Sequence, residues 1–255
     1  MPTIKLILEY DGTAYAGWQR QLNQPTIQEA VETAIEDVTQ AKVSVMGAGR
    51  TDAGVHALGQ VASFRTDRDM LPREWTRALN AHLPETIAVR SAAIMPENFH
   101  ARHSAKGKLY EYRILNRPDR PVVDRHYCWH VHKALDDAAM NQAAMVLIGS
   151  HDFSSFETQP TENDDPICHI QRLTVFRQGA LLRIEVYADR FLKQMVRSIV
   201  GTLVEVGLDK RSPDSLRMIL NSRDRSSAGK TAPPQGLFLV RVDYEPPAVL
   251  AGADS

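Results

Sequence analysis

Hydrophobic patterns typical of strands and helices follow one another along this chain in an order that occurs twice. In the first half, residues 3–10 alternate as a strand, and Thr26 with Glu29 forms the capping box that opens a helix. The other predicted elements of this half are strands at about 43–47 and 57–65, a helix at 72–83 and a strand at 87–95. The resulting order, β-α-β-β-α-β, limits the fold more than any other feature.

The second half has the same order, with one strand-like addition at 126–132. Its predicted elements are a strand at 108–116, a helix at 135–149, a hairpin at 168–189 that turns at Gln178-Gly179, helices at 191–206 and 213–222, and a strand at 237–244. Two split β-α-β units predict an α+β fold of two ferredoxin-like halves with a central antiparallel sheet and a cleft. We expect halves at 1–105 and 106–245, followed by a tail at 246–255.

Composition excludes several other classes of protein. The chain has 255 residues, of which 43% are apolar and 24% charged, as in ordinary globular proteins rather than disordered or collagen-like ones. No apolar run approaches the roughly 20 residues of a membrane span, and the N-terminus does not resemble a signal peptide. Cys128 and Cys168 are the only cysteines, so no disulfide framework is expected. We therefore expect a cytoplasmic protein with no membrane partner.

The charge is nearly balanced but unevenly distributed. Lys and Arg total 30 against 31 Asp and Glu, which gives a net charge of −1. Between His100 and Lys133, however, eight basic residues face three acidic ones, and five of the nine histidines lie there. A local basic stretch on a near-neutral chain is typical of a protein that binds an anion in one place, although a solvated surface gives the same composition.

Two glycine-containing segments resemble nucleotide-binding motifs, and both fail on inspection. In residues 47–54 the position that a dinucleotide fingerprint needs as glycine is Asp52, and a strand follows instead of a helix. Gly229-Lys230-Thr231 resembles the end of a P-loop, but Asp224 replaces the required upstream glycine. Neither segment predicts a nucleotide cofactor.

A metal site is a weaker possibility at 126–132. The side chains of His126, Cys128, His130 and His132 would share one face of a strand. Four ligands along a straight strand span roughly 20 Å, so they cannot converge on one ion without a bend. We expect no metal, and a metal-dependent RNA hydrolase that uses these histidines stays open as an alternative.

The segment 47–54 instead presents an arginine and an aspartate between glycines. Glycines permit a sharp turn and a close approach of substrate to the backbone. Asp52 could then serve as a nucleophile or general base, and Arg50 could handle negative charge. An aspartate that only caps its own turn would look the same in isolation.

Several segments in chain order resemble the motifs of the tRNA pseudouridine synthase A family. The signature segment is Gly49-Arg50-Thr51-Asp52-Ala53-Gly54-Val55-His56-Ala57. The others are Tyr10-Asp11-Gly12-Thr13 with Tyr15, Gly17, Trp18 and Gln19; Phe99-His100-Ala101-Arg102; Lys108, Tyr110 and Tyr112; His151 to Phe156; Phe191 with Met195-Val196-Arg197; and Gly236-Leu237-Phe238-Leu239. The resemblance runs from residue 10 to about 244.

This resemblance implies a cofactor-independent isomerase with a pseudouridine synthase core, which converts uridine to pseudouridine at positions 38, 39 and 40 of the tRNA anticodon arm. Asp52 matches the catalytic nucleophile, and its attack on uracil C6 or on ribose C1′ stays undecided. Tyr110 matches the tyrosine that packs against the target base, and Arg197 the arginine that pairs with the aspartate. Arg50 would enter the space that a flipped nucleotide leaves.

The resemblance also implies partners, namely the anticodon stem-loop of tRNA and a second copy of the chain. We assign further RNA contacts to His56 in the signature and to Arg102, Lys106 and Lys108 in the basic stretch. The alternative from another class is a non-catalytic RNA-binding protein on the same fold. Such a protein gains nothing from a carboxylate that faces phosphates, because like charges repel.

Overall fold

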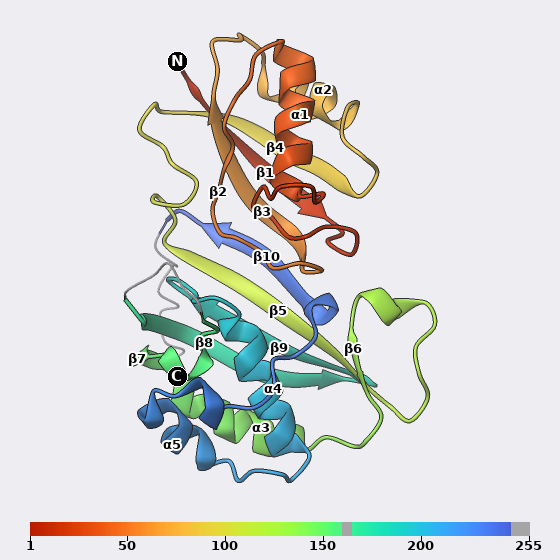
Figure 1. Ribbon diagram of the computed structural model, residues 1–255, viewed down its shortest axis with the longest axis vertical. Helices are drawn as coiled ribbons and strands as arrows, with labels where there is room; N and C mark the ends of the chain where they lie inside the picture. Colours follow the sequence, from red (N-terminus) through yellow and green to blue (C-terminus); the bar gives the residue numbers. More distant parts are fainter. Residues whose placement is uncertain (160–164, 246–255) are drawn as a thin grey trace, which may run out of the picture.

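One large sheet organises the molecule (Figure 1). The computed structural model describes residues 1–159 and 165–245, and ten strands of that part of the chain join in a single sheet. The strands are β1 (Thr3–Tyr10), β2 (Met46–Gly47), β3 (His56–Arg65), β4 (Ile87–Met95), β5 (Gly107–Asn116), β6 (Trp129–Val131), β7 (Gly149–Asp152), β8 (Ile167–Gln178), β9 (Leu181–Ala188) and β10 (Leu237–Asp243). The sheet is open, with β4 and β7 at its ends.

The first half packs two helices on its strands, α1 (Ile27–Thr39) and α2 (Pro72–Asn80). α1 begins as the capping box predicts, because the Thr26 hydroxyl accepts a hydrogen bond from the Glu29 N–H at 3.4 Å. Its buried side chains include Ile27, Val31 and Ile35, which recur at helical spacing. The strand order here is β4-β1-β3, with β2 also on β3 and all pairs antiparallel.

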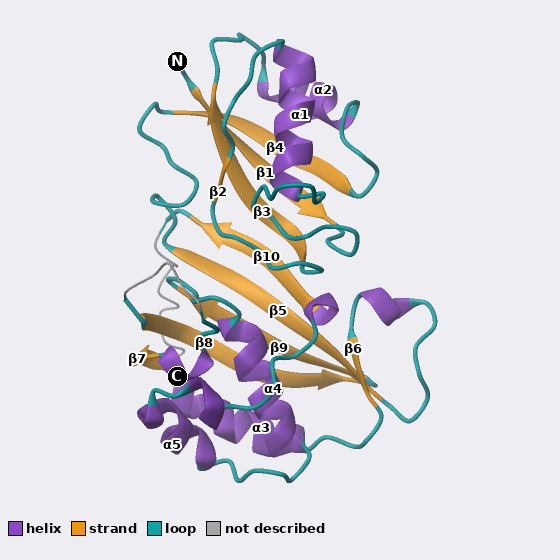
Figure 2. Cartoon of the chain, viewed as in Figure 1, coloured by secondary structure: helices purple, strands orange, loops and turns teal. Residues whose placement is uncertain are grey.

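The second half carries α3 (Asp137–Ala144), α4 (Met195–Gly207) and α5 (Ser215–Ser222), which cover its strands in Figure 2. Its strand order is β10-β5-β9-β8. When β6 and β7 are left aside and the strands of each half are numbered in chain order, both orders read 4-1-3-2, the ferredoxin-like arrangement. The predicted α+β fold of two such halves is therefore confirmed. The boundary between residues 105 and 106 stays a prediction, and the expected tail lies outside the described residues.

The two halves meet at a narrow seam between β3 and β10. These strands are parallel and pair only through Phe238 with His56 and Leu239 with Ala57. One edge of β3 is fully occupied by β1, so β2 and β10 share the other edge. The connection from β2 to β3, residues 48–55, must therefore run along the seam.

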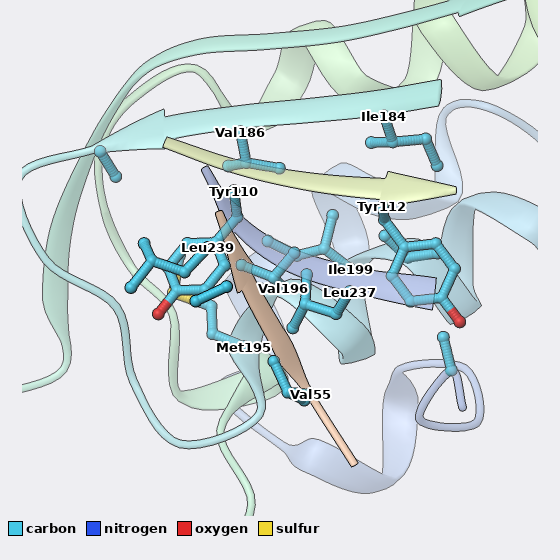
Figure 3. Packing of buried hydrophobic residues seen from close by; sticks show 14 of the residues in the cluster. Val55, Tyr110, Tyr112, Ile184, Val186, Met195, Val196, Ile199, Leu237 and Leu239 are labelled. Carbon is cyan, nitrogen blue, oxygen red and sulfur yellow. The ribbon is translucent and has the colours of Figure 1, made fainter. Parts of the chain in front are cut away.

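A continuous hydrophobic layer crosses this seam on the helix side of the sheet. Directly paired residues point to the same face, and one row of such pairs includes Tyr10, Ala57, Leu239, Tyr110 and Val186. Figure 3 shows Tyr110 and Leu239 packed with Met195 and Val196 of α4. The layer positions α4 against the connection 48–55.

Some predicted elements differ from the structure. The strand at 126–132 was wrong in its first half, because residues 124–126 form a 3-10 turn and only 129–131 pair with β5. The Cys128 thiol donates a hydrogen bond to the Asp124 carbonyl at 3.2 Å, which stabilises that turn. The helix predicted at 135–149 is shorter: α3 spans Asp137–Ala144, residues 145–147 form a 3-10 turn, and Gly149, with φ 109°, begins β7. α4 begins four residues later than predicted, since Gln194 is left-handed at φ 59°.

Candidate active site

The catalytic loop, defined here as residues 48–55, is held by backbone contacts to the N-terminal segment. The Trp18 N–H donates to the Thr51 carbonyl at 3.0 Å, and the Val55 N–H closes a turn onto the Asp52 carbonyl at 3.1 Å. Gly17 has φ 104°, and a Cβ there would lie 2.6 Å from the Thr51 oxygen. Only glycine allows this approach, which fixes the backbone next to Asp52.

Buried side chains support the same loop from the sheet. The Tyr10 hydroxyl lies 2.8 Å from the Thr51 hydroxyl, and the Gln60 amide donates to the Gly49 carbonyl at 2.9 Å. Burial raises the pKa of Tyr10 to about 12, so its hydroxyl keeps its proton at neutral pH. Tyr10, Thr51 and Gln60 therefore fix the loop on the side of the first half.

Asp52 pairs with an arginine from the other half. The Arg197 Nη1 donates to Asp52 Oδ2 at 2.8 Å, while its Nε donates to the Ala232 carbonyl at 2.8 Å. The arginine side chain is 12% exposed, but that of Asp52 is 30% exposed. A guanidinium with two fixed acceptors orients the carboxylate, which stays accessible to a substrate.

Tyr110 lies beside this pair on β5. Its ring is 4.9 Å from that of Phe191 in an edge-on contact, and the residue is 6% exposed. Burial raises the pKa of Tyr110, and the charge of Asp52 raises it further. A neutral tyrosine next to an accessible carboxylate provides a flat surface on which a base can pack.

Comparison with known proteins agrees with this geometry. A family model described as tRNA pseudouridine synthase matches residues 6–104 and 143–245. The chain belongs to this family. Relatives named tRNA pseudouridine synthase A include one from Thermoanaerobacter sp. (strain X514), 46% identical over 96% of this chain and 100% of its own, and one from Agrobacterium fabrum, 44% identical over 96% and 93%. A third, from Methylobacterium nodulans, is 46% identical over 98% and 99%.

The Lys108 side chain, which is predicted to contact RNA in this pseudouridine synthase, reaches the catalytic loop from β5. A Cβ added to Gly49 would lie 3.4 Å from the Lys108 Cε and 4.0 Å from the Tyr110 hydroxyl. Burial lowers the pKa of Lys108, and the charge of Arg102 lowers it further.

The other predicted RNA contacts are arranged less closely. Arg50 is exposed and its Nε donates to the Gln19 side chain at 3.2 Å. Lys106 is exposed beside the start of β5, where its N–H donates to the Asp243 carbonyl at 2.8 Å. Roles for Arg50, Arg102 and Lys106 in RNA binding stay predictions.

His56 is 1% exposed, and both of its ring nitrogens are engaged inside the protein. Nδ1 accepts from the Gly12 N–H at 3.1 Å, and Nε2 lies 2.9 Å from the His126 carbonyl, to which it donates. Burial lowers the pKa of His56, so the ring is neutral and its 3.2 Å approach to Asp11 is not an ion pair. This position favours a structural role over the predicted RNA contact, which stays a prediction.

Sequence reasoning did not assign roles to Tyr10, Gln60 or Phe191, although these residues shape the site. Tyr10 and Phe191 belong to the motifs quoted above, whereas no sequence signal distinguishes Gln60.

Within residues 1–159 and 165–245, no group of three or more His, Cys, Asp or Glu could hold a metal ion. No helix in that part of the chain is long and apolar enough to cross a membrane.

Proposed function

We propose that this pseudouridine synthase converts uridine to pseudouridine at positions 38, 39 and 40 in the anticodon arm of tRNA. The observation that most supports this proposal is the 2.8 Å pair of Asp52 with Arg197, which come from different halves and meet beside Tyr110. The activity belongs where tRNA is used, in the cytoplasm. A homodimer that shares one tRNA is part of the same proposal.

The reaction needs a group that can bond and leave again. A carboxylate oxygen of Asp52 attacks uracil C6 or ribose C1′, and the bond between N1 and C1′ breaks. The retained base turns, and C5 bonds to C1′. If Asp52 had bonded to C1′, C5 displaces the carboxylate as it bonds; if it had bonded to C6, the carboxylate is eliminated afterwards. The C5 proton is lost to solvent and N1 takes up a proton, so the carboxylate is released unchanged. Arg197 orients Asp52 through these steps, and Tyr110 packs against the base, which must leave its stack to reach the carboxylate.

The test uses tRNA with tritium at uracil C5, incubated with the protein in excess EDTA. Formation of the bond between C5 and C1′ expels the tritium, so its release from an intact RNA supports the isomerase. We expect Asp52→Asn to abolish release while the dissociation constant for tRNA stays within a few-fold. Equal loss of binding and turnover would make Asp52 structural, and no release by the wild-type protein would favour the non-catalytic RNA-binding alternative.

A further inference from the structure

The basic stretch 100–133 separates into two groups because β5 runs through its middle. Lys106 and Lys108 lie at the start of β5, next to the Gly49 end of the catalytic loop. Arg117, Arg120 and Arg125 follow the end of β5, in the connection that projects at the right of Figure 1 and returns to β6. The two groups of positive charge are therefore separated by the length of the strand.

A cavity of about 220 Å³ lies where the second group meets the other end of the catalytic loop. Its lining residues are Thr13, Gly54, Arg125, His126, Pro234 and Gln235. The side chains among them are cationic or neutral, and none is a carboxylate. Gly54 has φ 75°, and a Cβ there would lie 3.1 Å from Pro234, so glycine keeps this side of the cavity open.

Contacts to the scaffold of the catalytic loop hold the cavity wall in place. The His126 carbonyl is the acceptor for buried His56, and the Tyr127 hydroxyl donates to Asp11 Oδ2 at 2.8 Å. The Tyr127 ring also lies 5.2 Å from the His56 ring. Asp11 Oδ1 in turn accepts from both the N–H and the hydroxyl of Thr13. Arg125 is thus presented from a segment that is fixed to the site.

The dimensions and chemistry of the cavity suit one anionic group. At roughly 30 Å³ of liquid per water, 220 Å³ holds about seven waters, which is below the size of a typical small-molecule pocket. A guanidinium, an imidazole and an amide line it, and these groups bind phosphate oxygens in nucleic-acid complexes, whereas the Thr13 hydroxyl already donates to Asp11.

We propose that this cavity binds a backbone phosphate of the RNA, with Arg125 as its cationic contact, while Lys108 contacts a second phosphate at the other end of the catalytic loop. This inference rests on the proposed function, because the nucleotide between the two phosphates is the one presented to Asp52. The two phosphate contacts determine which nucleotide of the RNA lies opposite Asp52.

The test uses synthetic anticodon stem-loop RNAs, each with one neutral methylphosphonate in place of a phosphate near the target uridine. Their dissociation constants are measured with wild-type protein, Arg125→Ala, Arg125→Lys and Lys108→Ala. Arg217→Ala is the matched control, because Arg217 is an exposed arginine on α5. We expect Arg125→Ala to weaken binding of the unmodified RNA roughly tenfold and to lower the salt slope by about 1. Arg125→Lys should restore most of the affinity.

The decisive result is a coupling at one phosphate. A methylphosphonate at one position should weaken RNA binding by the wild-type protein but not by Arg125→Ala. A methylphosphonate on the other side of the target uridine should weaken binding by the wild-type protein but not by Lys108→Ala. Equal effects at every position in wild type and Arg125→Ala would overturn the inference, as would coupling of both variants to one phosphate. Tritium release by the wild-type protein scores the proposed function separately. If the wild-type protein releases tritium but Arg125→Ala binds the RNA as tightly as Arg217→Ala does, the phosphate contact is overturned while the proposed function stands.

Discussion

Asp52 and His56 stand four residues apart in one signature segment, and the structure gives them opposite surroundings. The Asp52 side chain is 30% exposed beside Arg197, whereas His56 is 1% exposed between the segments around Gly12 and His126. The exposure of Asp52 suits the chemistry that we propose for it, whereas the burial of His56 favours a structural role. A motif match identifies which residues matter, but only their burial distinguishes these two roles.

The buried imidazole of His56 makes stability depend on pH. Burial holds its pKa below the usual 6.5 and Arg113 lowers it further, while Asp11 partly opposes this. Below about pH 6.5 the unfolded chain therefore binds a proton that the folded chain does not, and the free energy of unfolding falls. Above that pH the contribution is fully present. The loss per pH unit is at most about 1.4 kcal/mol.

We expect wild-type protein to lose more stability than His56→Asn between pH 7 and pH 5.5, measured by urea denaturation. Asparagine keeps an acceptor for the Gly12 N–H but does not titrate. Equal losses in the two proteins would mean that the imidazole of His56 is protonated in the folded state.

At the scale of elements, α4 and the segment 230–232 together position Arg197. The Ala232 carbonyl can accept from Arg197 only because this segment crosses α4 at Gly201. A Cβ on Gly201 would lie 1.7 Å from the Lys230 oxygen and 3.3 Å from the Ala232 nitrogen. This glycine is therefore needed for the site although it touches no substrate.

Gly201→Ala should destabilise the protein by roughly 2 kcal/mol or more, because overpacking outweighs the approximately 1 kcal/mol that alanine gains in a helix. It should also lower kcat, since the backbone that holds Arg197 must shift. The control is Gly179→Ala in the hairpin turn, where φ is 61° and nothing lies within 4 Å of the new Cβ. Only backbone strain of about 1–2 kcal/mol is expected there, with kcat unchanged. Calorimetry and tritium release measure both effects, and a Gly201→Ala protein as stable as wild type would contradict this account.

Elements with their own hydrophobic period were predictable, and those defined by contacts elsewhere were not. β1 and β4 match their predicted ranges, and α1 begins where its capping box predicts, because each has one buried face. Residues 126–132 have the alternating pattern of a strand in their His and Cys side chains. The Cys128 thiol, however, donates a hydrogen bond to the Asp124 carbonyl, and the chain turns there. The glycine-flanked segment made Asp52 a candidate nucleophile or general base, whereas the proposed roles of Tyr110 and Arg197 came from the family resemblance alone, because spacing in sequence carries no geometric information about them.

At the scale of the molecule, a net charge of −1 conceals an uneven distribution, because eight basic and three acidic residues lie between His100 and Lys133. Lys108 lies at the Gly49 end of the catalytic loop, and Arg125 lines the cavity at its Gly54 end. With two to four phosphate contacts, the dissociation constant for tRNA should rise roughly ten- to a hundredfold between 50 and 200 mM salt. Filter binding over that range measures this rise. A flat dependence would show that these cations do not face the RNA.

The repeated element order predicted two similar halves but not how they join. The seam between β3 and β10 consists of two residue pairs, His56 with Phe238 and Ala57 with Leu239, about 180 residues apart in the chain. No local pattern encodes a pairing so short and so distant. The meeting of Asp52 with Arg197 depends on it, so the site geometry could be described only from the structure.

The central place of β10 also orders events during synthesis. This strand joins β3 to β5, yet the ribosome adds its residues 237–243 after every other strand of the described sheet. A nascent chain that lacks them has two separate sheets, each with an unpaired edge, and its aspartate has been made long before its arginine is in place. We therefore expect no activity from a nascent chain until residues 237–243 have been added, and until then the edges of β3 and β5 that β10 covers are exposed.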